Sequence, residues 1–314
     1  MQLRRLDPLA NAGPYQRLSK SPVKSFSLTE AQYERVKAQR PDLLVAEGGG
    51  AVIGHPFRDL LEVHYAFPDV EAFRDRFEAM FNRVVGASSK AEAPRGLVIA
   101  FRDRPNRPVA ETLFWGLALD EGQQWVEMNL VAVPEQPEPP ETVGDAYSLG
   151  DVTAADFEAL AAVDAEVTGL PSLTAAGVRS ILSDARLVRL VLSPSKGLVQ
   201  RTGEAEAVGY VSLRTDPGGW GVIEALAVRP AAQQDLRQPL VDWCVAWLRN
   251  NGGRRMRMRV AIDDSVVIAA LRGAGFTPGE TGLDYTRSVD PAEVTAKVDE
   301  RKAHGTVIKF GDWR

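Results

Sequence analysis

Residues 221–247, GVIEALAVRPAAQQDLRQPLVDWCVAW, constrain the fold of this chain more than any other stretch. A run of β-type apolar residues ends at Val228-Arg229-Pro230, and a short polar segment follows. An amphipathic helix comes next, because apolar residues recur at spacings of three and four: Leu236, Leu240, Val241, Cys244, Val245 and Leu248. A strand, a loop and a helix N-terminus in this order predict an anion site, since unpaired backbone N–H groups converge there.

The bulk properties exclude several classes of protein. The 314 residues are enough for about two domains of roughly 150 residues each. A net charge of -5 gives no reason to expect a nucleic-acid partner, which would require a basic face. No apolar run reaches membrane length, and a single cysteine excludes an internal disulfide. We therefore expect a cytoplasmic protein that binds neither nucleic acid nor membrane.

The clearest domain boundary is residues 134–145, PEQPEPPETVGD, whose proline and acidic residues predict an extended linker. Before it we expect an extended arm over residues 1–25 and a first domain over 26–133. After it we expect a second domain over 146–288 and a tail over 289–314, with a helix to about Ala303 and a strand at 306–310. The tail would dock on the first domain or on a partner subunit, as in a homodimer.

In the first domain, Ser27 and Glu30 predict a capping box that opens a helix. The glycines at 48–50 lie between two apolar segments and favour a β-hairpin over a phosphate-binding loop, because no helix follows them. A strand at 60–67, a helix to Val85 and a strand at 96–101 come next. A further helix after Pro108 and a closing strand at 125–133 complete the domain.

The second domain is expected to begin with a strand at 146–149 and helices at 154–168 and 174–183. The strands that follow are predicted at 185–192, 197–201, 207–214 and 221–228. After the amphipathic helix we expect a strand at 255–262, a helix at 264–273 and a strand at 283–287.

This second half resembles the GNAT superfamily of acyl-CoA-dependent N-acyltransferases. The matching residues are the strand at 222–228, the Val228-Arg229-Pro230 turn, the helix after it, and residues 264–276 ending in Gly275-Phe276. The first half resembles an eroded second copy, with matches at 45–49 and 106–119. The resemblance implies an α/β (α+β) fold of two GNAT-like domains, each a mixed, mostly antiparallel twisted sheet flanked by helices, the first of them non-binding.

The resemblance also implies acetyl-CoA, or another acyl-CoA, as co-substrate and no metal. The strand backbone at Leu226, Ala227 and Val228 would pair with the pantetheine arm. The pyrophosphate would lie near the residues at the loop and late-helix positions of the family motif: Gln233, Gln234, Leu236, Arg237, Gln238 and Asp264. Several residues disfavour a close phosphate. Leu236 and Gln238 replace small residues, Pro239 removes a donor, and Asp235 adds negative charge.

Glu224 occupies the strand position where several GNAT enzymes carry a general base for the substrate amine. A solvated or cross-strand charge is an equally good interpretation of Glu224. The family's proton-donating tyrosine position is taken by Leu271, so Tyr285 is the nearest alternative phenol in the sequence. Asp264 is expected mainly to cap its helix.

Other chemistry-bearing residues favour structural roles. Cys244 is expected to be a buried thiol, and Trp243 and Trp247 to pack against the neighbouring domain. His55, His64 and His304 lie far apart in the sequence without metal-ligand spacing. The arginines at 254, 255, 257 and 259 alternate with apolar residues, which predicts a salt-bridged strand face or, less simply, a phosphate surface.

Two functions follow from these observations. The first is an N-acyltransferase whose second domain transfers an acyl group to a small-molecule or peptide amine. The second is a catalytically degenerate GNAT scaffold that binds another ligand or a protein. The Val-Arg-Pro turn and Glu224 favour the enzyme, whereas the altered loop and Leu271 favour the binding module.

Overall fold

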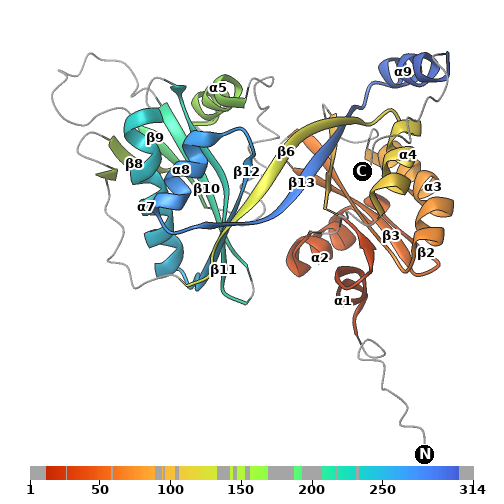
Figure 1. Cartoon of the computed structure of the whole chain (residues 1–314), viewed down its shortest axis with the longest axis horizontal. Helices are drawn as coiled ribbons and strands as arrows, with labels where there is room; N and C mark the ends of the chain where they lie inside the picture. Colours follow the sequence, from red (N-terminus) through yellow and green to blue (C-terminus); the bar gives the residue numbers. More distant parts are fainter. Residues whose placement is uncertain are drawn as a thin grey trace, which may run out of the picture. The chain divides into compact units, whose positions relative to one another are not determined.

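The computed structural model describes residues 12–25, 27–57, 59–88, 94, 96–102, 106–132, 142–143, 147–152, 156–168, 187–192, 207–216, 218–230 and 233–303. The chain divides into two compact units (Figure 1). Unit 1 comprises residues 1–56, 60–123 and 283–314, and unit 2 comprises residues 57–59 and 124–282. The expected helix at 174–183 and the expected strands at 197–201 and 306–310 lie outside the described residues.

Unit 1 is a mixed sheet with helices on its faces. Its elements are α1 (Pro14–Ser19), β1 (Val23–Lys24), α2 (Glu30–Gln39), η1 (Pro41–Leu43), β2 (Leu44–Glu47), β3 (Gly50–Phe57), β4 (Leu60–Phe67), α3 (Val70–Ser88), β5 (Gly96–Phe101), α4 (Arg107–Gly116) and α9 (Pro291–Ala303). The start of β6 (Asp120–Leu130) and the end of β13 (Thr277–Ser288) also belong to it. The strand order is β2-β3-β4-β5-β13, with β1 pairing β4.

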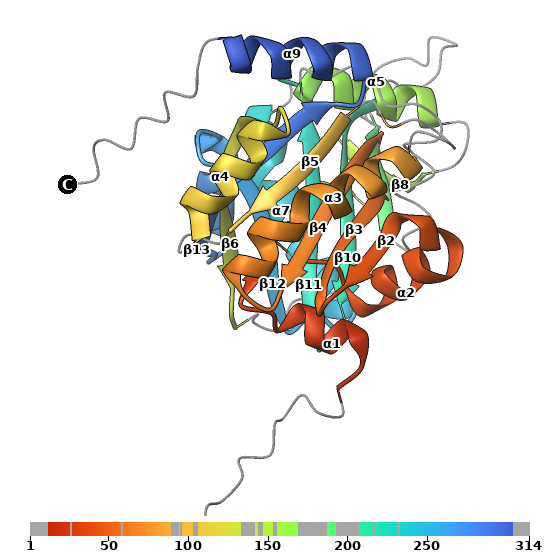
Figure 2. The same ribbon diagram turned by 90° about the vertical axis from the view of Figure 1, so that its right-hand side faces the viewer.

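An aromatic core joins α3 to the sheet of unit 1. Figure 2 shows α3 lying across the face of the strands. Apolar residues that recur along α3 at helical spacing are buried, namely Phe73, Phe77, Met80, Phe81 and Val84, whereas Val70 is partly buried. Tyr65 of β4 stacks on Phe73 with ring centroids 4.8 Å apart. Because side chains alternate along a strand, Glu62 and His64 of β4 point to the opposite face.

The glycine turn is a hairpin turn, as predicted. Gly48 and Gly49 have φ of 55° and 80°, and they join β2 to β3 in antiparallel register from Glu47↔Gly50 to Leu44↔Ile53. Positive φ at both central residues is the requirement of a tight two-residue hairpin, which glycine meets without steric cost.

Two predictions about the N-terminal region are wrong. Residues 14–19 form α1 rather than an extended arm, with Pro14 at the first helical position, where its missing N–H costs nothing. The capping box of α2 begins at Thr29, not at Ser27: the Thr29 side chain accepts from the Gln32 backbone N–H, and the Gln32 side chain accepts from the Thr29 N–H. A capping box can use Gln or Glu at its fourth residue. Ser27 with Glu30 and Thr29 with Gln32 therefore both fit the sequence pattern.

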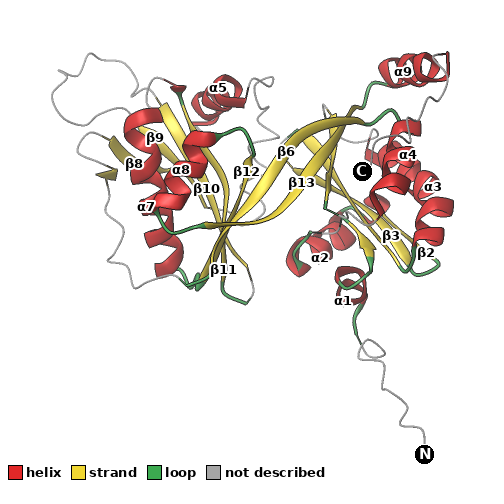
Figure 3. Ribbon diagram, viewed as in Figure 1, coloured by secondary structure: helices red, strands yellow, loops and turns green. Residues whose placement is uncertain are grey.

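Unit 2 has the same kind of architecture (Figure 3). Its elements are β7 (Thr142–Val143), β8 (Tyr147–Asp151), α5 (Phe157–Thr168), β9 (Leu187–Leu192), β10 (Ala207–Asp216), β11 (Trp220–Val228), α7 (Gln233–Asn250), β12 (Arg255–Ala261) and α8 (Ser265–Gly273), with the larger part of β6 and the start of β13. The strand order is β6-β12-β11-β10-β9-β8-β7. β7 forms inside the expected linker and pairs with β8.

The sheet of each unit includes a strand from the other half of the sequence. In unit 2, β6 runs antiparallel to β12, from Met256↔Leu130 to Ala261↔Trp125. In unit 1, the end of β13 runs antiparallel to β5, from Leu283↔Phe101 to Ser288↔Gly96. The strand expected to close the first half therefore forms, but residues 125–130 of it pair within unit 2. A local apolar pattern specifies a strand and its buried face, not its partner.

Helix α9 docks on unit 1. The Arg301 guanidinium donates to the backbone oxygens of Trp115 and Leu119 and to Asp120, and it lies 3.9 Å from the centroid of the Trp115 ring. Lys297 also pairs with Asp120. The helical part of the tail thus contacts residues of the first half of the sequence. None of the helices described is long and apolar enough to cross a bilayer.

Candidate functional site

A β-bulge at Glu224 interrupts the centre of unit 2. Ser212 of β10 pairs with Ala225 and Leu213 pairs with Ile223, so the register shifts by one residue and Glu224 is the additional residue on β11. A bulge bends its strand and increases the local twist, and bulges are common beside active sites. The bulge therefore places the expected general-base residue at an irregular point of the strand.

β11 also stops pairing with its other neighbour, β12, next to Glu224. β11 and β12 are parallel and pair from Trp220↔Arg255 to Ile223↔Met258. β11 continues to Val228 and β12 to Ala261 without further pairs in this register. The edge of β11 that faces away from β10 is thus not paired with β12 from Glu224 to Val228.

Glu224 belongs to a largely buried network of charges. Arg214 Nε donates to Glu224 Oε1 over 2.8 Å, and Ser212 Oγ lies 3.4 Å from Oε2. Arg214 also pairs with Asp216, which accepts from Arg257 over 3.0 Å. The Glu224 side chain is 10% exposed and that of Arg214 is 15% exposed. The contacts of Glu224 are those of the cross-strand charge, one of its two expected interpretations. Glu224 also lies at the point where β11 stops pairing with β12.

The expected pantetheine-binding residues lie at the end of β11, and their side chains are buried. Leu226 and Val228 pack into the core with α7, whereas Ala227 packs with α5. The backbone oxygen of Leu226 accepts from Arg237 Nη1 over 2.7 Å. Arg237 therefore already contacts the backbone that a pantetheine arm would use.

The expected phosphate loop is helical. α7 begins at Gln233, so Gln233, Gln234 and Asp235 form its first turn, and Pro239 lies inside the helix rather than at its N-terminus. Leu236 is fully buried in the core, and Gln238 Nε2 donates to Asp242 over 2.9 Å. Neither side chain faces a loop. Pro239 has no N–H to donate to the backbone carbonyl four residues earlier, so α7 lacks one of its backbone hydrogen bonds there.

Arg237 is buried, and not all the hydrogen-bond donors of its guanidinium group are used. It is 5% exposed, and its Nε has no hydrogen-bond partner among the described residues. Burial lowers the pKa of Arg237, and attraction to Asp264 offsets this in part. The Asp264 side chain caps α8 by accepting from the Val267 N–H over 3.0 Å, as the sequence predicted. A buried guanidinium with an unused donor is a suitable contact for an anion.

Tyr285 and Glu224 are in different units. Tyr285 pairs with Ile99 in unit 1, and its hydroxyl lies 3.4 Å from Glu111 Oε1. Burial, followed by repulsion from Glu111, raises the pKa of Tyr285 above its usual range. In unit 2, Leu271 is fully buried at the position where a proton-donating tyrosine would stand. The structure does not bring the two expected catalytic residues together within either unit.

The other residues that the sequence singled out in unit 2 have structural surroundings. Cys244 is fully buried, and burial raises the pKa of its thiol above the usual range. The prediction that Trp243 packs against the neighbouring domain is wrong, because Trp243 is buried in the core of unit 2 itself and Trp247 packs on that core. Arg255 and Arg257 lie over the Trp220 ring and Arg259 over the Trp125 ring. Of the expected salt bridges on this basic strand face, Arg257 forms one, with Asp216.

Unit 1 contains a similar strand separation. β4 and β5 are parallel and pair from Leu60↔Gly96 to Glu62↔Val98, after which β4 continues to Phe67. Beyond that point an aromatic cluster joins the two strands. Phe114 of α4 lies 6.3 Å from Tyr65 of β4 and 6.0 Å from Phe101 of β5, measured between ring centroids.

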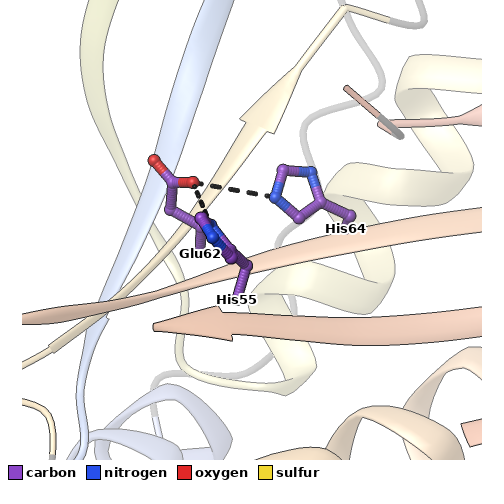
Figure 4. A group of neighbouring side chains, drawn as sticks. All are labelled: His55, Glu62 and His64. Atoms are coloured by element: carbon purple, nitrogen blue, oxygen red, sulfur yellow. Dashed lines mark hydrogen bonds and ion pairs between the residues drawn. The ribbon is translucent and has the colours of Figure 1, made fainter. Parts of the chain in front are cut away.

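Sequence reasoning missed a cluster on the other face of unit 1. His55, Glu62 and His64 lie together (Figure 4), although the spacing of the histidines in the sequence did not indicate a shared site. Glu62 Oε2 is 3.1 Å from His55 Nδ1 and 3.8 Å from His64 Nε2. Burial raises the pKa of Glu62, but its interactions with His55 and His64 outweigh the effect of burial and hold that pKa well below its usual range. The hairpin of β3 and β4 brings these residues together, and His304 lies outside the described residues.

No family model and no curated protein matches the chain. Solved structures do resemble it. A candidate acetyltransferase from Pyrococcus horikoshii is 9% identical over 82% of this chain and 77% of that one, with a TM-score of 0.52. A GCN5-related N-acetyltransferase from Sphaerobacter thermophilus is 17% identical over 77% of each chain, with a TM-score of 0.49.

A tandem GNAT protein from the clavulanic acid biosynthesis pathway is 16% identical over 79% of this chain and 82% of that one, with a TM-score of 0.47. At these identities the likeness concerns the fold. The mixed, mostly antiparallel sheets with flanking helices confirm the predicted fold class. The chain shares its fold with the candidate acetyltransferase from Pyrococcus horikoshii, whose TM-score is above 0.5.

Proposed function

We propose that this protein is an acyl-CoA-dependent N-acyltransferase and that unit 2 holds the acyl-CoA. One observation carries the proposal: the bulge at Glu224 coincides with the last β11–β12 pair, at Ile223 and Met258. This leaves one edge of β11 available to hydrogen-bond an extended ligand, as a further strand would. A pantetheine arm has two amides at a spacing that suits such pairing.

Arg237 is the residue we assign to the diphosphate. Nη1 is held by the Leu226 oxygen, which fixes the guanidinium, while Nε has no partner among the described residues. A phosphate would supply both the missing acceptor and a negative charge for the buried cation. In unit 1 the aromatic cluster around Phe114 joins the ends of the separated strands, which favours unit 2 as the binding unit.

In the proposed reaction the acceptor amine attacks the thioester carbonyl, the C–S bond breaks, and the thiolate leaves. Glu224 takes the proton from the amine directly or through a water molecule. Arg214 engages Oε1 of Glu224, so we assign the proton transfer to Oε2. With Leu271 at the usual tyrosine position, water is the proton source that we assign to the thiolate. The acceptor is a small-molecule or peptide amine.

The ion pair of Glu224 with Arg214 favours a second candidate, a non-catalytic GNAT scaffold that binds a ligand or a protein. A carboxylate held by a guanidinium is less available to take a proton. The two candidates differ in one respect: the scaffold requires no acyl transfer.

Calorimetry with acetyl-CoA tests the proposal. We expect binding by the full chain and a loss of affinity of about 10- to 100-fold in Arg237→Gln, the size of a lost hydrogen bond to a charged group. Arg272→Gln, at an exposed position on α8, is the matched control and should bind like the wild type. Thermal unfolding without ligand checks that Arg237→Gln folds. No heat and no thermal shift with millimolar acetyl-CoA would reject the acyl-CoA site.

A further inference from the structure

Three potential metal ligands converge on one face of the unit 1 sheet. His55 comes from β3, and Glu62 and His64 come from the adjacent strand β4. Glu62 and His64 are two residues apart, so their side chains lie on the same face. One ligand atom from each residue lies within 4.8 Å of the others. Figure 4 shows both imidazole rings directed at the same carboxylate.

The distances are close to those of a bound ion. Zinc ligands lie about 2.0–2.2 Å from the metal, so two ligands of a tetrahedral site are about 3.4 Å apart. Glu62 Oε2 is 3.1 Å from His55 Nδ1 and 3.8 Å from His64 Nε2. The two separations from Glu62 are therefore within about 0.4 Å of the tetrahedral value, and all three ligand atoms lie within 4.8 Å of one another.

The burial and the neighbours of these three residues also support coordination of a metal ion. His55 is 4% exposed and His64 is 5% exposed, so both rings are fixed by packing. Ser27 Oγ lies 3.4 Å from His64 Nδ1, the ring nitrogen opposite the one that faces Glu62. Metal-binding histidines commonly have such a partner, which sets the tautomer. The Glu62 side chain is 32% exposed, which leaves room for water as a further ligand.

We propose that His55, Glu62 and His64 form a binding site for a divalent transition-metal ion, and that Zn²⁺ is the ion it takes. Two imidazoles and one carboxylate are a donor set that zinc uses with an open fourth position. The site lies in unit 1, whereas the proposed acyl-CoA site lies in unit 2. The two proposals therefore rest on different residues and can fail independently.

Zinc titration of chelator-treated, full-length protein tests the site. We expect one zinc ion per chain by calorimetry and elemental analysis. Glu62→Gln and His55→Asn should each lower the zinc affinity at least about 100-fold, because loss of a ligand costs more than loss of an outer-shell partner. Glu78→Gln, at an exposed position of α3, and His304→Asn are matched controls and should bind zinc as the wild type does.

Thermal unfolding in the presence of chelator separates loss of zinc from loss of fold. If either variant fails to fold, imidazole NMR signals of the wild-type protein provide the readout, and zinc should shift the signals of two histidines. The proposal is overturned if the wild type binds no zinc, or if zinc binds equally to the Glu62 and His55 variants. A further contradicting result is zinc binding that leaves the signals of His55 and His64 unchanged.

Discussion

At the scale of single residues, the proposed acyl transfer assigns to Glu224 the role of a base that acts from within an ion pair. The bulge puts Glu224 at the strand separation, and Arg214 binds one of its two oxygens. A base can act from such a pair if its second oxygen takes the proton. The charge network then positions the carboxylate instead of blocking it.

We predict that Glu224→Gln lowers the rate of acyl transfer by about 10²- to 10⁴-fold, the range of general-base catalysis. The affinity for acetyl-CoA should change little, because Gln keeps the size of the side chain. Acyl transfer to a panel of primary amines provides the measurement. Glu166→Gln is the control, since Glu166 is also paired with an arginine of unit 2, Arg229, at 3.4 Å. Equal losses in the two variants would assign Glu224 a structural role.

The sequence locates some site residues and conceals others for identifiable reasons. Asp264 is predictable as a helix cap because capping is local, within three residues of the chain. Glu224 is found through a motif, but its partner Arg214 lies ten residues away on another strand. The pairing of His55 with Glu62 could have been found by counting outward from the short β3–β4 connection. Spacing along the chain alone conceals ligands that a hairpin brings together.

At the scale of secondary-structure elements, the close packing of β10 against β11 shapes the centre of unit 2. Gly209 pairs with Val228, and a Cβ atom at position 209 would lie 2.6 Å from the backbone oxygen of Ala227. The backbone oxygen of Ala227 cannot move to relieve this clash as the end of a flexible side chain could. Glycine is therefore required at position 209, opposite the last residue of β11.

We predict that Gly209→Ala destabilises the protein by about 1–3 kcal/mol, the usual cost of overpacking. Gly86→Ala is the matched control. Gly86 lies in α3, and a Cβ atom there would meet no other atom within 4 Å, so alanine should stabilise by about 0.5–1 kcal/mol. Urea unfolding measures both effects. A neutral Gly209→Ala would mean that β10 and β11 are less tightly joined than the register indicates.

Elements are easier to predict than their ends and partners. The 3.6-residue period identifies the buried face of α3 correctly. The start of α7 is misplaced by the sequence pattern, because the polar residues 233–235 carry no apolar signal although they are helical. The strand at 125–130 is recognisable, yet its partner β12 lies far away in the sequence. Such pairings depend on the whole fold.

At the scale of the whole molecule, the two halves of the sequence depend on each other. Unit 1 includes residues 283–288 as a strand beside β5, and unit 2 includes residues 124–130 as a strand beside β12. A sheet that lacks such a strand presents an unpaired edge, which favours aggregation. The proline-rich segment at 134–145 is therefore not a point at which the chain separates into two complete folds.

We predict that fragments 1–133 and 146–314, expressed separately, each lack a cooperative thermal transition. Each fragment carries the strand that completes the sheet of the other, so co-expression should give a soluble complex of the two. Circular dichroism and co-purification provide the measurements. A cooperative transition of fragment 146–314 alone, at the temperature of the full chain, would contradict this dependence.

The central proposal is that acyl-CoA lies along the part of β11 in unit 2 that does not pair with β12. Hydrogen–deuterium exchange of the full chain, with and without acetyl-CoA, tests it most directly. We predict that acetyl-CoA slows exchange over residues 224–228 and in the first turns of α7, whereas residues 63–67 of β4 in unit 1 exchange at an unchanged rate. Protection of β4 instead of β11, or no protection of β11 at saturating ligand, would contradict the claim.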